Sequence, residues 1–500
     1  MKNKENITDC LILFFLTIGF FWRVIFENKF LFFSKSLISA YERMYTISVS
    51  AKSFFSVVKA FDLSIFYPAN LFTSLLIRFT HEVDLGFRFF EICFVAHFFL
   101  VAIFTYLLIK YGLRLSRYAS LFGAIGFSFA GIFVTHILNF SFYFSLTWLP
   151  LIFLLYLKGF EKNRIRYLVL GGLIMGASVL SGSAYGIFYT SLVILAFFAY
   201  EAIFNKQIRI SDLIGKTFMI LFIGWFIGVV FILVDYFYNA IPIFREVFYV
   251  SVPKLISFYK PILFPNSYPF SENWWEINIY LGMSTLILAF ASFVFLKERK
   301  QIRFFAFNFL IFTSLLLLVS KEGSFLDYYF KIFPNLDFFN FPTRMRVLSN
   351  FSLIVMSCFC IDALYNQLNR NKTKILKTYI TLLAICVIVC MSILLPMHYV
   401  NEILSLDSSF KAAFSVYGPR KFIQMNIFFW LLLITIMSLA VFGLVLAKKS
   451  KKLIIGLIFL LVLDIFTYWS NLNPISYRYG DKWEMKPPSE YGIGVNKNNE

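Results

Sequence analysis

The chain has 500 residues, of which 60% are hydrophobic and only 15% carry a charge, whereas a soluble domain of this size has about a quarter charged residues. Its net charge is +19, but most Lys and Arg residues lie in short clusters between apolar runs, and no nucleic-acid-binding motif accompanies them. The composition therefore excludes an ordinary soluble domain, the charge pattern argues against a nucleic-acid partner, and both predict an all-α polytopic membrane protein.

The N-terminal segment has the Lys-then-apolar shape of a signal peptide, but no small-residue cleavage site follows, so we expect a retained first span. A span needs about 20 apolar residues. On that basis we predict about thirteen spans: 8–27, 88–109, 118–137, 143–157, 167–181, 185–203, 217–237, 277–296, 304–320, 346–364, 378–396, 425–447 and 453–470. The small residues of "SGSAYG" separate two spans at 181–186. The residues near 143 could instead continue the preceding hairpin at membrane depth.

The distribution of Lys and Arg predicts the orientation of these spans. Counted from an inside N-terminus, every loop on the inside is short and basic, which is the positive-inside pattern. The loops on the outside are longer and less basic: 28–87, 238–276, 321–345, 397–424 and the tail 471–500. The inside loops are too short for an enzyme domain, and the sequence holds no nucleotide-binding motif. We therefore expect the functional residues in the outside loops.

The first outside loop, 28–87, holds the carboxylates Glu42, Asp62 and Asp84 and the guanidinium of Arg43. Part of this loop has the pattern of one or two amphipathic helices that lie on the membrane surface. A carboxylate there could accept the proton of an attacking hydroxyl, and a basic neighbour could hold a phosphate. The alternative is that these charges only solvate an interfacial helix.

The later outside loops contribute further candidates for substrate binding. Trp274 and Trp275 could stack on a sugar, although tryptophan also marks the bilayer interface. Asp235 lies inside the outer end of a predicted span, where a carboxylate is a functional candidate by default. Arg344 and Arg346 lie at the outer end of another predicted span. They could bind a phosphate, or they could extend their charged ends to the membrane surface as snorkelling anchors.

The cysteine and histidine residues do not form a recognisable metal site. All six cysteines lie within or at the edge of apolar runs, without a histidine or acidic cluster beside them, which favours buried thiols. His97 and His136 are single histidines in apolar surroundings, and we expect them to be hydrogen-bonded core residues rather than ligands.

Five stretches of the sequence occur in an informative order. They are "FYPANLF" (66–72), "FGAIGFSFAGIFVTHILNFSFYFSLTWLPLIFLLY" (122–156), "LSGSAYGIFY" (180–189), "YKPILFPNSY" followed by "IYLGMSTLILA" (259–289), and "FPNLDFFNFPTRMRVLSNFSL" (333–353). Together they resemble the YfhO-type bacterial membrane proteins of the GT-C glycosyltransferase superfamily. The resemblance covers most of residues 10–470.

The resemblance implies a GT-C-like transmembrane domain over 1–470 in the bacterial cytoplasmic membrane, and the positive-inside pattern predicts that the N-terminus is in the cytoplasm. It implies transfer of a sugar from a polyprenyl-phosphate-linked donor to a cell-envelope glycolipid, polymer or protein on the outer face. The superfamily has its catalytic carboxylate in the first outside loop, which points to Glu42 as the base, with the other two carboxylates of the loop in reserve. Arg43 and Arg344 would hold the phosphate, and Tyr67 would contact the substrate.

The competing function is that of a non-catalytic membrane subunit, or of a transporter for lipid-linked sugars, in envelope polysaccharide assembly. Transport would predict charged residues that face one another within the membrane, and an accessory role would predict dispensable loop carboxylates. No resident cofactor is expected, and a divalent metal ion is left open as an aid to the leaving phosphate. The expected partners are the lipid-linked sugar, membrane lipid and the envelope acceptor, with a second membrane protein left open.

Overall fold

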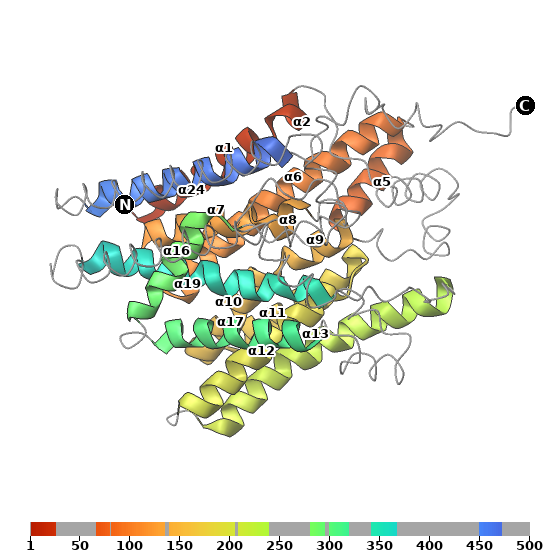
Figure 1. The fold of residues 1–500 in the computed structure, drawn as a ribbon. Coiled ribbons are helices and arrows are strands. Elements are labelled where there is room, and N and C mark those ends of the chain that lie inside the picture. Colours follow the sequence, from red (N-terminus) through yellow and green to blue (C-terminus); the bar gives the residue numbers. More distant parts are fainter. Residues whose placement is uncertain are drawn as a thin grey trace, which may run out of the picture. The chain divides into compact units, whose positions relative to one another are not determined.

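The computed structural model describes residues 2–26, 67–80, 82–135, 140–205, 209–239, 281–295, 300–319, 342–367 and 450–472. Its regular elements are helices, with no strand in these ranges (Figure 1). Among the described residues, six helical stretches are long and apolar enough to cross a membrane: Asp84–Gly112, Arg117–Val134, Phe140–Lys162, Tyr185–Phe204, Ile210–Phe231 and Arg346–Asn366. The all-α prediction is thus confirmed for this part of the chain, and the apolar helices agree with a membrane protein. The total of thirteen spans stays a prediction, because 378–396 and 425–447 lie outside the described residues.

The chain divides into two compact units, which are considered separately. Unit 1 comprises Met1–Phe104, Phe133–Arg245 and Asn473–Glu500, and unit 2 comprises Thr105–Ile132 and Glu246–Leu472. The helices of unit 1 are α1 (Lys2–Phe20), α2 (Trp22–Phe26), α5 (Pro68–Thr80), most of α6 (Val83–Leu107), α9 (Phe140–Leu146), α10 (Leu149–Lys162), α11 (Ile165–Ala177), η4 (Ser178–Ser181), α12 (Tyr185–Phe204) and α13 (Ile210–Asn239). Those of unit 2 are η2 (Leu108–Gly112), α7 (Arg117–Ser128), α16 (Met283–Ala291), η5 (Ser292–Phe295), α17 (Lys300–Val319), η7 (Pro342–Met345), α19 (Arg346–Gln367) and α24 (Ser450–Leu472); α8 (Gly131–Thr135) lies at the division.

The break predicted at 181–186 is confirmed. After α11 and η4 the chain turns at Gly182, whose φ is 84°, and α12 begins at Tyr185. A residue with a Cβ atom is strained at this φ, so the turn favours glycine. The residues near 143 belong to the stretch Phe140–Lys162, which is long enough to form a span of its own.

Glycines allow α11 and α13 to pack closely in unit 1. A Cβ atom added to Gly172 would lie 2.7 Å from Cβ of Ile223, and one added to Gly176 would lie 2.6 Å from Cβ of Ile227. Helices in a membrane gain little from the hydrophobic effect, so close van der Waals contact across small residues is a main source of their association. The two glycines therefore hold the backbones of α11 and α13 at a separation that larger residues would not permit.

Helix α19 lies at the centre of unit 2, and the apolar window of its span is fully buried. The ring of Phe351 on α19 contacts the ring of Phe127 on α7, with centroids 5.2 Å apart. A Cβ atom added to Gly126 would lie in ordinary contact, at 3.6 to 3.9 Å, with Thr285 of α16, Ile354 of α19 and Leu461 of α24. Four helices thus meet at one glycine.

The close approach of α11 and α13 can be tested by comparing Gly176→Ala with Gly215→Ala. The first variant forces a methyl group against Ile227 and the carbonyl of Gly224, and we expect it to lower the free energy of unfolding by about 1–3 kcal/mol. Gly215 has nothing within 4 Å of an added Cβ atom, so there alanine should be neutral or stabilise the helix by up to about 1 kcal/mol. Thermal unfolding in detergent micelles measures both. Equal melting temperatures would contradict this packing.

Candidate functional site

The predicted site residues fall into two groups. Glu42, Arg43, Asp62, Trp274 and Trp275 lie outside the described residues, and so does the side chain of Asp235, whose backbone forms part of α13. Their roles, and the approach of Glu42 to Arg344, stay predictions. The other group comprises Tyr67 and Asp84 in unit 1, and Arg344 and Arg346 in unit 2.

Tyr67 is the centre of a buried hydrogen-bond network that joins three helices of unit 1. It directly precedes α5, and its hydroxyl lies 2.7 Å from Nε2 of His97 on α6. The indole Nε1–H of Trp148, at the start of α10, donates to the same hydroxyl over 3.2 Å. Nδ1 of His97 lies 2.6 Å from the carbonyl oxygen of Cys93, one turn earlier on α6. The prediction that His97 is a hydrogen-bonded core residue is confirmed.

The chemistry of the partners fixes the direction of these hydrogen bonds. A carbonyl oxygen can only accept, so Nδ1 of His97 carries a proton and donates it to Cys93. Nε2 of the neutral ring is then an acceptor, and the Tyr67 hydroxyl donates to it. The indole of Trp148 can only donate, so Tyr67 accepts from it. Every polar atom of the three side chains therefore has the partner that its chemistry requires.

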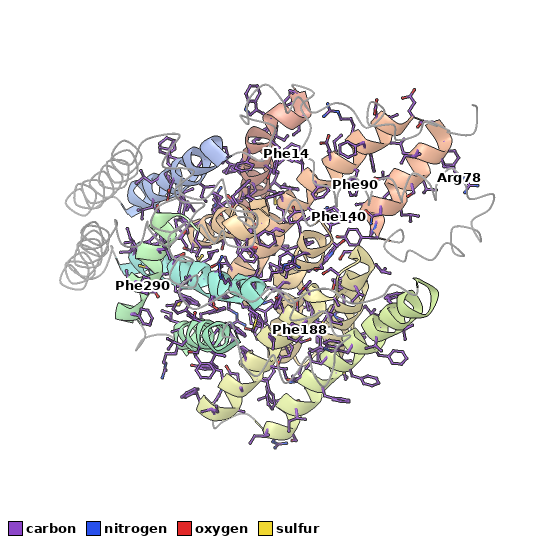
Figure 2. The ribbon with its side chains drawn as sticks, turned by 45° about the vertical axis from the view of Figure 1, so that its right-hand side comes forward. Phe14, Arg78, Phe90, Phe140, Phe188 and Phe290 are labelled. Carbon is purple, nitrogen blue, oxygen red and sulfur yellow. The ribbon has the colours of Figure 1, made fainter. Side chains whose placement is uncertain are left out.

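The network is enclosed by aromatic rings. The imidazole of His97 stacks on Phe144 with centroids 4.0 Å apart, and Tyr67 stacks on the same ring at 5.1 Å. Around them, Phe90 of α6 meets Phe140 of α9 edge-on at 5.7 Å (Figure 2).

Helix α6 also carries a charged stripe at its beginning. Asp84 lies in the first turn, and Arg88 and Glu91 follow at spacings that place all three on one face. Nη1 of Arg88 lies 3.1 Å from Oε2 of Glu91, whose side chain is only 2% exposed. Glu91 is a candidate that the sequence analysis missed, although a carboxylate inside the predicted span 88–109 is a default signal for function.

The two arginines of unit 2 are buried. Arg344 in η7 is 4% exposed and Arg346, the first residue of α19, is 3% exposed. Burial does not fit snorkelling anchors, whose guanidinium groups reach water. The same unit contains Asp464, a fully buried carboxylate inside the predicted span 453–470, which the sequence analysis also missed. Its Oδ2 lies 3.1 Å from the point that an added Cβ atom on Gly282 would occupy, just before α16.

The prediction of buried thiols is confirmed for Cys358 and Cys360, whereas Cys10 and Cys93 are only half-buried, and none of these four described cysteines forms a disulfide. Among the described residues, no group of three or more His, Cys, Asp or Glu side chains is placed to hold a metal ion. No family model, no curated protein and no solved structure matches the chain. The geometry of the two units and the resemblance of the sequence stretches therefore carry the functional argument.

The Tyr67 network predicts a large effect for the loss of one hydroxyl. In Tyr67→Phe the acceptor on His97 and the donor on Trp148 both lose a buried partner, and we expect the free energy of unfolding to fall by about 2–4 kcal/mol. As a control, Tyr111→Phe removes the hydroxyl of a tyrosine that is 40% exposed, where we expect a change within about 0.5 kcal/mol. Denaturation in micelles compares the two. Similar losses in both variants would count against the network.

Proposed function

We propose that this chain is a polytopic membrane glycosyltransferase of the GT-C type, which transfers a sugar from a polyprenyl-phosphate-linked donor to a cell-envelope acceptor on the outer face of the cytoplasmic membrane. The proposal rests on the resemblance of five sequence stretches to YfhO-type proteins. The observation that carries it is that stretches with this resemblance, although far apart in sequence, pack against one another within each unit. Residues brought together in this way are typical of a shared site or its framework.

In unit 1, three of these stretches meet. Tyr67 of "FYPANLF" accepts the hydrogen bond from Trp148 of "TWLP". Ser181 of "LSGSAYG" donates its hydroxyl hydrogen to the carbonyl oxygen of Ser141, at 3.0 Å. A Cβ atom added to Gly186 would lie 2.5 Å from the carbonyl oxygen of Ser145, so the approach of α12 to α9 requires glycine. Each of the three stretches thus supplies a residue that takes part in a hydrogen bond or a close backbone contact with another stretch.

In unit 2, the last two of the five stretches meet the first part of the second stretch around α19. Phe127 of "FGAIGFSFAG" contacts Phe351 of "VLSNFSL", and Gly126 lies against Thr285 of "YLGMSTLILA". The last of the five stretches also contains the buried Arg344 and Arg346. A buried guanidinium at a helix start can hold a phosphate by paired N–H donors, which supports a role with the leaving polyprenyl phosphate.

The proposed reaction is an inverting displacement at the anomeric carbon of the donor. The acceptor hydroxyl attacks this carbon, the bond from the carbon to the phosphate oxygen breaks, and polyprenyl phosphate leaves with the bonding electrons. Glu42 takes the proton of the attacking hydroxyl. Arg344 and Arg43 stabilise the negative charge of the departing phosphate. Asp62 and Asp84 remain the reserve carboxylates for the base.

Transfer from a radiolabelled polyprenyl-phosphate sugar by the purified, reconstituted protein tests this function. We expect Glu42→Gln to lower kcat by about 10²- to 10⁴-fold, the usual cost of removing a general base. Glu82→Gln is the matched control, because Glu82 is an exposed glutamate of the same predicted loop, and it should leave the rate unchanged.

Two results would overturn the assignment. Full activity of Glu42→Gln would remove Glu42 from the mechanism, and the same comparison would then be made with Asp62→Asn and Asp84→Asn. No transfer by the unmodified protein with any envelope acceptor would favour the alternative function, a non-catalytic subunit or a lipid-sugar transporter.

A further inference from the structure

Helix α5 has the reverse of the pattern that a surface helix shows in water. Its buried face consists mainly of small and polar residues, with one isoleucine: Ala69, Asn70, Thr73, Ser74 and Ile77. Its exposed face is apolar, with Phe72 at 57%, Leu75 at 39% and Phe79 at 80% exposure. A helix in contact with water turns its apolar side inward, because burial of each such side chain is worth about 1.5–3 kcal/mol. This arrangement is stable only where the surroundings of the exposed face are themselves apolar.

The Tyr67 network sets the depth at which α5 begins. His97 lies near the middle of the 29-residue apolar stretch Asp84–Gly112, and Tyr67 hydrogen bonds to it directly before α5 starts. The far end of α5 is tied to the beginning of α6, since α5 ends at Thr80 and α6 begins at Val83. The start of α5 is therefore beside the middle of the span, and its end is beside the first turn of the span.

The lengths of the two helices agree with this path. The 13 residues of α5 rise by about 20 Å, and α6 rises by about 21 Å from Val83 to His97. Helix α5 thus runs antiparallel along the first half of α6, and the two are drawn as neighbours in Figure 1. Arg78 lies in the last turn of α5 (Figure 2). At this end of the helix a basic side chain can reach the membrane surface.

We propose that α5 is a half-membrane helix whose face formed by Phe72, Leu75 and Phe79 is in contact with lipid acyl chains. Its exposure resembles that of α13, a helix of spanning length, on which Phe218, Phe222 and Phe226 are 55–63% exposed. The polar face of α5 is turned away from the lipid, and Thr73 bonds its hydroxyl to the carbonyl of Ala69 at 2.8 Å.

The proposal moves residues 68–80 from the expected outside loop 28–87 into the bilayer. Tyr67 would then lie near the middle of the membrane, and the chain would leave the membrane through α5. This lipid contact does not depend on the proposed sugar transfer, and its test uses no activity measurement. If transfer also occurs, a lipid-facing helix beside the first outside loop suits a donor whose tail lies in the bilayer.

Depth measurements with spin labels test the proposal. Labels are attached to Phe72→Cys, Leu75→Cys and Phe79→Cys in the full chain, with the six native cysteines replaced by alanine, in phosphatidylcholine vesicles. We expect high collision rates with oxygen and low rates with a water-soluble nickel complex at all three positions. Seven residues of helix separate the outer two positions, so the label at 72 should lie about 10 Å deeper than the label at 79.

Two control labels calibrate the measurement. Phe218→Cys on α13 should report lipid, and Glu82→Cys, in the link between α5 and α6, should report water. Access of the nickel complex at position 72 would overturn the proposal. Equal depths at 72 and 79 would show a helix that lies flat on the surface instead. Low access of both reagents would show that a protein partner, rather than lipid, covers this face.

Discussion

The structure of unit 1 depends on the hydrogen bond between Tyr67 and His97. It is formed between residues thirty positions apart and links the chain just before α5 to the middle of α6. In an aqueous domain, water could replace a lost partner at modest cost. Within a membrane there is no such substitute, and each unsatisfied polar group costs several kcal/mol. The network with Trp148 and Cys93 therefore tolerates few alternative arrangements, and it determines where α5 begins.

The contacts between apolar helices in the two units also reflect the membrane environment. Helices that gain little from the hydrophobic effect associate through close contact, and the glycines of α11 allow this contact with α13. In unit 2, α7, α16, α19 and α24 meet in ordinary van der Waals contact around Gly126. The described helices of each unit are thus held in close contact and form a framework. The sugar transfer proposed here needs such a framework, since its carboxylate and its arginines must be held at fixed positions relative to the donor.

Much of the helical layout could be predicted from the sequence, because hydropathy and small-residue breaks report directly on spans. The break at Gly182 and the span that includes residue 143 are examples. The pairing of Tyr67 with His97 could not be predicted, since nothing local in either residue specifies a partner so distant. The buried Glu91 could have been found, because a carboxylate within an apolar run is itself a signal. The burial of the polar face of α5 could not be predicted, because its mixed composition is also typical of a loop exposed to water.

The tautomer of His97 is the most direct test of this account. Solid-state nitrogen NMR of the ¹⁵N-histidine-labelled protein in bilayers distinguishes the two ring nitrogens, and the spectrum of His97→Gln assigns the signal among the four histidines. We expect a neutral ring at pH 7, with a protonated Nδ1 and an unprotonated Nε2 that accepts a strong hydrogen bond, and we expect this hydrogen bond to be lost in Tyr67→Phe. A ring protonated at Nε2, or a signal unchanged by Tyr67→Phe, would contradict it.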